Sequence, residues 1–124
     1  MDVVLWIIAG LLAVAFLAAG GMKLAQPKAK LQASGMGWVE DFSPNAVKAV
    51  GAVEVLGALG LILPAALDVA PVLVPVAATG LFLMMVGAAV THVRRSELNG
   101  IAPSVVLGLL SLIVAIFRFG PYAF

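Results

Sequence analysis

Glu54 is a carboxylate inside a run of glycine and aliphatic residues that has the composition of a membrane span. Between Ala49 and Leu67 it is the only charged residue. A carboxylate in the hydrocarbon core of a bilayer is costly and marks a functional site by default. The positions three and four residues away on a helix are mostly small and favour the close approach of a second helix: Val50, Gly51, Gly57 and Ala58.

Lys23 and His92 are the residues best placed to act with Glu54. Lys23 ends the first apolar run and His92 ends the third, on the side of the membrane where the helix of Glu54 begins. A lysine side chain reaches inward, so we expect a Lys23–Glu54 ion pair, which lowers the cost of burying each charge. The sequence thus predicts an intramembrane polar site of these three residues. The alternatives are snorkelling of Lys23, a boundary position for His92 and a purely structural ion pair.

A second polar set follows one face of the last apolar run. Its small and polar members recur at spacings of four, three, four and three: Ser104, Gly108, Ser111, Ala115 and Arg118. Such a face is typical of helix packing, with the serine hydroxyls forming hydrogen bonds. Arg118 is predicted on the side of the membrane opposite Lys23. Asp68 lies on that same side and is its expected ion-pair partner.

The composition indicates a membrane protein. Of 124 residues, 64% are hydrophobic and 10% are charged, whereas a soluble domain has about 25% charged residues. A soluble chain this short could not bury so much apolar surface, so lipid is the expected solvent. The absence of cysteine excludes thiol chemistry, and a net charge of +1 gives no support for nucleic-acid binding. One histidine and no dense carboxylate cluster predict no protein-built metal site.

Four apolar runs are long enough to cross a bilayer, because a helix rises about 1.5 Å per residue and the hydrocarbon core is about 30 Å thick. The chain starts without a basic region, which disfavours a cleaved signal peptide. Ser43 and Pro44 suit the N-cap and first position of a helix, and Trp38 suits an interfacial anchor before them. We expect spans at about 3–23, 45–67, 70–91 and 101–119, with an interfacial loop over 24–44.

These elements predict an all-α fold. A single domain over residues 1–124 forms an integral membrane, up-down-up-down four-helix bundle. Basic residues gather in the two loops on one side, whereas the other side has only Arg118. The positive-inside rule therefore places the basic loops in the cytoplasm and both termini outside. The basic residues of the cytoplasmic side are Lys23, Lys28, Lys30, Lys48, Arg94 and Arg95.

Two short motifs resemble those of DoxX-like proteins. Residues 20–24, which read GGMKL, are similar to the Gly-x-x-Lys-Leu ending of the first helix in that family. Residues 51–63 are similar to its second-helix glutamate motif, and His92 at the end of the third span also fits. The resemblance covers nearly the whole chain. It implies a small four-helix protein of the bacterial inner membrane, with Lys23 and Glu54 at the family's polar positions.

The resemblance also implies a function, since some DoxX-like proteins are membrane subunits of quinone-reducing sulfur oxidoreductases. We therefore expect a membrane subunit or accessory protein of a redox-linked complex, acting through partner chains, a quinone or lipid. The sequence has no self-sufficient catalytic set and no intrinsic cofactor motif, so an enzymatic activity would need a partner subunit.

Two other functions are open alternatives. One is a small proton-coupled transporter that uses Glu54, although the second span contains no aromatic residue to hold a cation. The other is a structural membrane protein in which Glu54 only sets the register of the helices. A homo-oligomer is also open, because small-residue faces suit dimerisation as well as packing within one bundle.

Overall fold

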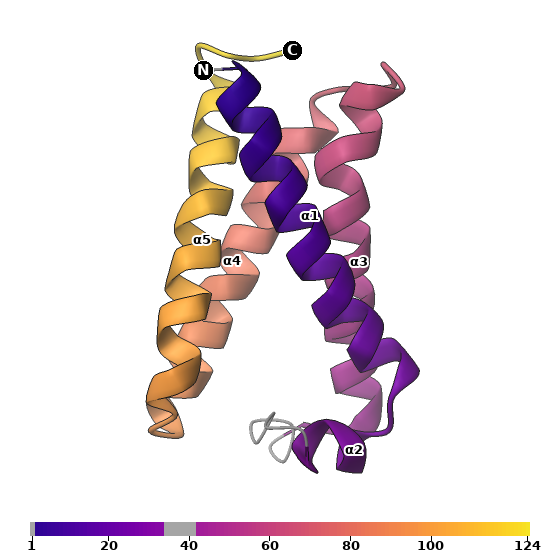
Figure 1. Ribbon diagram of the computed structural model, residues 1–124, viewed down its shortest axis with the longest axis vertical. Helices are drawn as coiled ribbons and strands as arrows, with labels where there is room; N and C mark the ends of the chain where they lie inside the picture. Colours follow the sequence, from indigo (N-terminus) through magenta and orange to yellow (C-terminus); the bar gives the residue numbers. More distant parts are fainter. Residues whose placement is uncertain (1, 34–41) are drawn as a thin grey trace.

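The computed structural model of the protein describes residues 2–33 and 42–124. Most of this described chain is helical (Figure 1). The helices are α1 (Asp2–Ala25), α2 (Lys28–Ala33), α3 (Pro44–Ala66), α4 (Leu73–Arg94) and α5 (Leu98–Phe119). The predicted interfacial anchor Trp38 lies outside the described residues.

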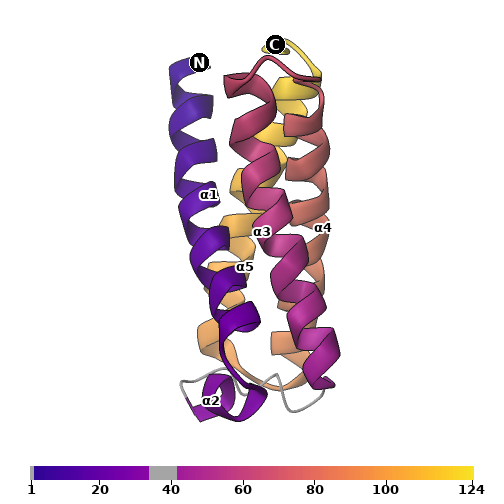
Figure 2. The same cartoon turned by 90° about the vertical axis from the view of Figure 1, so that its right-hand side faces the viewer.

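The four long helices confirm the expected all-α membrane bundle. Each has at least 22 residues, which at about 1.5 Å per residue exceeds the ~30 Å of a hydrocarbon core. All four are apolar enough to cross a membrane. Successive long helices run in opposite directions, so both chain termini lie at one end of the bundle (Figures 1 and 2). We call this end the terminal end, and the opposite end, which carries α2, the α2 end.

Local signals decide where α3 begins. The Ser43 side-chain oxygen accepts a hydrogen bond from the Ala46 N–H at 3.1 Å, and Pro44 occupies the first turn, where a missing N–H is tolerated. The short helix α2 lies across the same end of the bundle (Figure 1). Its Leu31 is fully buried against Val47 of α3, which ties the segment after α1 to the start of α3.

Three helix boundaries differ by three residues from the expected spans, and one of them is the end of α4, which lies at Arg94 instead of residue 91. α4 begins at Leu73, three residues later than expected, because the connection before it turns through left-handed backbone at Asp68 (φ 53°) and Ala70 (φ 44°). α5 begins at Leu98, three residues earlier than expected. A left-handed residue at Ser96 (φ 56°) reverses the chain within a very short turn, so the predicted polar loop is largely absorbed into helix.

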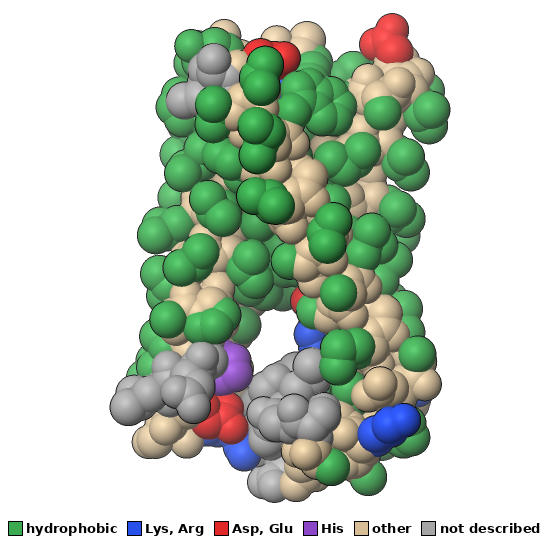
Figure 3. All heavy atoms as spheres, viewed as in Figure 1, with side chains coloured by type: hydrophobic (Ala, Val, Ile, Leu, Met, Phe, Trp, Pro, Cys, Tyr) green, Lys and Arg blue, Asp and Glu red, His purple; other side chains and the backbone are tan. Residues whose placement is uncertain are grey.

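The long helices pack as two pairs. α1 lies along α3 and α4 lies along α5, whereas the pairs meet mainly through α3 and α4 and less through α1 and α5. A central core joins all four helices through fully buried side chains such as Phe16, Leu61, Leu81 and Val114. Toward the α2 end the two pairs separate (Figure 1). Figure 3 shows an opening between them at this end, while hydrophobic side chains cover most of the remaining surface in view.

α1 and α3 approach each other closely at Gly20 and Gly51. A Cβ atom on Gly20 would lie 2.6 Å from the Gly51 carbonyl oxygen, and one on Gly51 would lie 2.8 Å from the Gly20 carbonyl oxygen. The Glu54 Cβ is 3.0 Å from the first of these positions, and the Lys23 Cβ is 2.7 Å from the second. The two glycines therefore let Lys23 and Glu54 each lie against the neighbouring helix.

We predict that Gly20→Ala destabilises the bundle by about 1–3 kcal/mol, because the new methyl group would meet backbone and force α1 away from α3. Gly21→Ala is the matched control, since nothing lies within 4 Å of a Cβ at Gly21. Circular dichroism of the purified variants during unfolding in detergent measures the stability of each. Equal stability of Gly20→Ala and Gly21→Ala would contradict the close approach.

Candidate functional site

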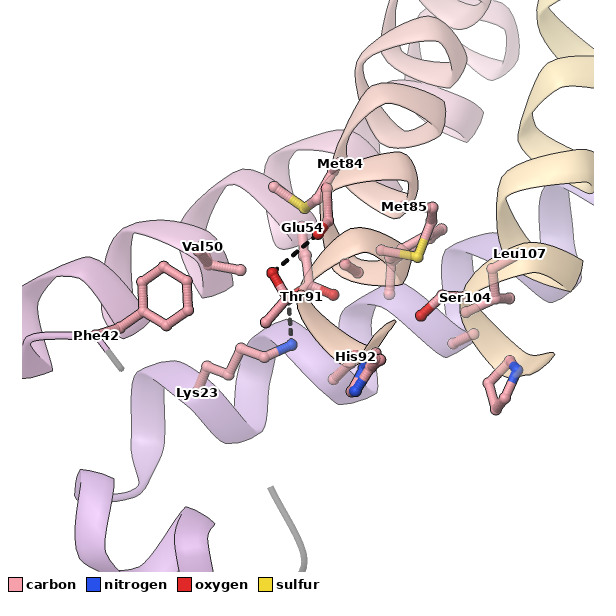
Figure 4. Close-up of a pocket in the computed structure, with 16 residues that line it drawn as sticks. Lys23, Phe42, Val50, Glu54, Met84, Met85, Thr91, His92, Ser104 and Leu107 are labelled. Atoms are coloured by element: carbon pink, nitrogen blue, oxygen red, sulfur yellow. Dashed lines mark hydrogen bonds and ion pairs between the residues drawn. The ribbon is translucent and has the colours of Figure 1, made fainter. Parts of the chain in front are cut away.

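Lys23 of α1 and Glu54 of α3 meet inside the bundle. The Lys23 ammonium donates a hydrogen bond to Glu54 Oε1, and the two form an ion pair (Figure 4). The residues are only 7% and 3% exposed, respectively. Two charges removed from water to this degree are tolerated when each is paired and hydrogen-bonded. The helix crossing at the two glycines is what brings them within reach.

A cavity of about 470 Å³ adjoins this ion pair, between the two helix pairs at the α2 end. Its walls come from α1, α3, α4 and α5, and Phe42 contributes from the residue before the α3 cap. Apolar side chains dominate these walls, including Phe16, Val50, Met84, Met85 and Leu107. The polar groups on the walls are Lys23, Glu54, Thr91, His92 and Ser104 (Figure 4). This volume and composition are typical of a small-molecule site.

His92 lines the cavity from the last turn of α4, but its hydrogen-bond partner is not Glu54. Its Nδ1 lies 3.0 Å from Oε1 of Glu97, and the Arg95 Nε donates to Oε2 of the same carboxylate at 3.1 Å. The three predicted polar residues therefore share one cavity, yet only Lys23 and Glu54 contact each other directly. His92 belongs to a second polar cluster, made with Arg95 and Glu97.

Sequence reasoning missed Glu97. It follows His92 by five residues across the turn at Ser96, a spacing that no regular helix brings together. Partial desolvation acts to raise the pKa of Glu97, but hydrogen bonds from Arg95 and His92, together with the charge of Arg95, outweigh it and lower the pKa below its ordinary value. Glu97 is therefore an ionised acceptor at neutral pH. The contribution of this cluster to stability is present above the ordinary carboxyl pKa and is lost as the pH falls through the lowered value.

The two serines of α5 have different surroundings. Ser104 is buried and lines the cavity, opposite the α1–α3 pair. Ser111 is fully buried, and its hydroxyl donates to the Leu107 carbonyl oxygen at 2.8 Å, one turn earlier on the same helix. The hydroxyl of Ser111 is thus satisfied by its own backbone, so of the two only Ser104 belongs to the cavity.

A family model described as the DoxX-like family matches residues 7–114. The chain belongs to the DoxX-like family. The match includes every residue of the cavity wall, from α1 to α5. No curated protein and no solved structure matches this chain.

At its terminal end this DoxX-like protein has a third polar cluster, and here the expected pairing needs correction. Arg118 is 4% exposed, and its Nη1 donates to Asp2 Oδ1 at 2.6 Å and to the Tyr122 carbonyl oxygen at 2.9 Å. Its guanidinium carbon also lies 3.9 Å from the centre of the Phe124 ring. The carboxylate that meets Arg118 is therefore Asp2 and not Asp68. Arg118 is on α5, which contacts α1, the helix of Asp2, whereas Asp68 lies in the connection between α3 and α4.

We predict that Lys23→Met destabilises this DoxX-like protein by about 3–5 kcal/mol, because it leaves the buried Glu54 carboxylate unpaired. The double variant Lys23→Met with Glu54→Leu should recover most of that loss, since no charge remains to be paired. Equilibrium unfolding of the wild type, both single variants and the double variant in detergent gives the coupling energy. Additive losses in the double variant would contradict the ion pair.

Asp2→Asn should lower stability by about 0.2–1 kcal/mol, since Asp2 is 61% exposed on its side chain and its charge is partly screened by solvent. Asp68→Asn is the matched control and should leave the unfolding transition unchanged. The same unfolding assay at low and high salt checks the charge dependence. A larger loss from Asp68→Asn than from Asp2→Asn would restore the pairing first expected from the sequence.

Proposed function

We propose that the protein binds the head group of a lipid-soluble ligand of the quinone class in the cavity beside Lys23 and Glu54. The observation that carries this proposal is the cavity itself: about 470 Å³, mostly apolar, with a cation, a carboxylate and an imidazole on its walls. A quinone ring is flat and apolar on its faces and has oxygen atoms at its edge. Side chains such as Phe16, Met84 and Met85 suit the faces, and the Lys23 ammonium, a donor, suits an oxygen at the edge.

The position of the cavity supports a ligand that arrives from the bilayer. The cavity lies between the α1–α3 pair and the α4–α5 pair, and the space-filling view shows an opening between these pairs at the same end (Figure 3). A quinone has a polyprenyl tail, which would remain in lipid while the ring enters between the helices. Such a route would need no exposure of the ring to water.

In this proposal the protein is a membrane subunit or accessory protein of a redox-linked complex in the bacterial inner membrane. Membership of the DoxX-like family supports this role. The basic residues at the α2 end, such as Lys30, Lys48 and Arg94, would place that end in the cytoplasm and both termini outside. The polar groups of the cavity can hold and orient a ligand, and electron transfer would be the work of a partner chain.

Ala19→Phe should remove most of the quinone that co-purifies with the protein, because Ala19 lines the cavity and a phenyl ring there would fill it. Ala18→Phe is the matched control: Ala18 is the preceding residue of the same helix, is exposed and is not part of the cavity wall. Solvent extraction of protein in lipid nanodiscs, followed by mass spectrometry, measures the bound quinone per chain.

Two outcomes would count against this function. The first is wild-type protein that carries no more quinone than empty nanodiscs of the same lipid. The second is equal quinone content in Ala19→Phe and Ala18→Phe. Purification in mild detergent followed by proteomic analysis tests the subunit role separately, and we expect a redox protein to co-purify in stoichiometric amount.

A further inference from the structure

We infer that His92 accepts a hydrogen bond from a ligand hydroxyl, so that the cavity takes the reduced, hydroxylated form of its ligand in preference to the oxidised form. This inference rests on the proposed function and adds to it the chemical state of the ligand. The residues that carry it are His92, which lines the cavity, and Glu97, which holds His92 from outside the cavity wall.

The contact with Glu97 decides which nitrogen of His92 carries the proton. An ionised carboxylate can only accept hydrogen bonds, and Glu97 Oε1 lies 3.0 Å from Nδ1. Nδ1 must therefore be the donor. In the neutral imidazole the second nitrogen, Nε2, is then an acceptor with an available lone pair. Arg95 holds the other carboxylate oxygen through its Nε at 3.1 Å, which fixes the carboxylate in this orientation.

The same contact decides which nitrogen faces the ligand. His92 is part of the cavity wall, whereas Glu97 and Arg95 are not. Because Nδ1 is directed to Glu97, a ligand in the cavity meets the ring at Nε2. An acceptor at this point can receive a hydrogen bond from a ligand hydroxyl group. It forms no hydrogen bond with a carbonyl oxygen, which is itself only an acceptor.

The wall formed by α1 has the opposite character at Lys23. The Lys23 ammonium, which pairs with Glu54 Oε1, can donate hydrogen bonds but cannot accept them. A ligand oxygen near Lys23 would therefore act as an acceptor, while an oxygen near His92 would act as a donor. A quinol satisfies both walls, since each of its hydroxyl groups can donate and accept. A quinone satisfies only the Lys23 wall, and this difference is the basis of the expected preference.

The test compares three probes on full-length protein in nanodiscs without oxygen: a short-chain benzoquinone, its quinol, and the dimethyl ether of that quinol. One hydrogen bond corresponds to roughly a five- to tenfold change in dissociation constant, so we expect the quinol to bind more tightly than the other two by that factor. The dimethyl ether keeps the ring and its oxygens but cannot donate. This comparison needs no variant and so does not depend on any variant folding.

His92→Phe should abolish the preference for quinol while retaining binding of the quinone, because it keeps a ring and removes the acceptor. Glu97→Ala should weaken the preference and change the tautomer of His92. Since this chain has one histidine, ¹⁵N NMR of labelled histidine reports that tautomer directly. In the neutral imidazole of the wild type, Nδ1 should carry the proton and Nε2 should not.

Equal affinity of the wild type for quinone and quinol would overturn the inference and leave the proposed function standing. An undiminished preference in His92→Phe, with the variant folded by circular dichroism, would overturn it as well. Binding of none of the three probes would instead overturn the proposed function, and this inference with it. Tighter binding of the quinol than of its dimethyl ether, lost in His92→Phe, supports both.

Discussion

Two opposite charges can remain inside this bundle because α1 and α3 approach closely enough for them to meet. Gly20 and Gly51 bring the two backbones almost into contact, and Lys23 and Glu54 stand on either side of that crossing. Unpaired, each charge would face several kilocalories per mole of desolvation; paired, they hold one register of the α1–α3 pair. The close crossing and the ion pair therefore depend on each other.

The close packing of α1 against α3 is accompanied by a space between this pair and the α4–α5 pair. α1 with α3, and α4 with α5, form two well-packed pairs that meet through a core near the middle and separate toward the α2 end. The space between them at that end is the cavity, with the ion pair on one wall and His92 on another. Because the cavity lies at the junction of the two helix pairs, all four long helices contribute to its walls.

The polar residues at the two ends of the bundle are satisfied in different ways. At the α2 end, a turn of three residues folds Glu97 back onto His92, which orients the imidazole relative to the cavity. At the terminal end, the last residues fold over Arg118, so that a backbone carbonyl and the Phe124 ring surround it together with Asp2. The His92 imidazole therefore lines a cavity, whereas the Arg118 guanidinium is enclosed almost completely.

Much of this protein was determined by sequence alone, because lipid imposes strong rules on composition. Four apolar runs of this length predict spanning helices, and a glutamate inside one of them, Glu54, was expected to face the interior. Charge and helical periodicity also indicated that Lys23, Glu54 and His92 belong to one end. Tertiary structure decided which partners meet. Arg118 pairs with Asp2 instead of Asp68 because α5 lies beside α1. His92 contacts Glu97 because the turn between α4 and α5 folds back on the end of α4. The cavity also depends on the tertiary structure, because it forms where the two helix pairs separate. The sequence of a single helix does not predict it.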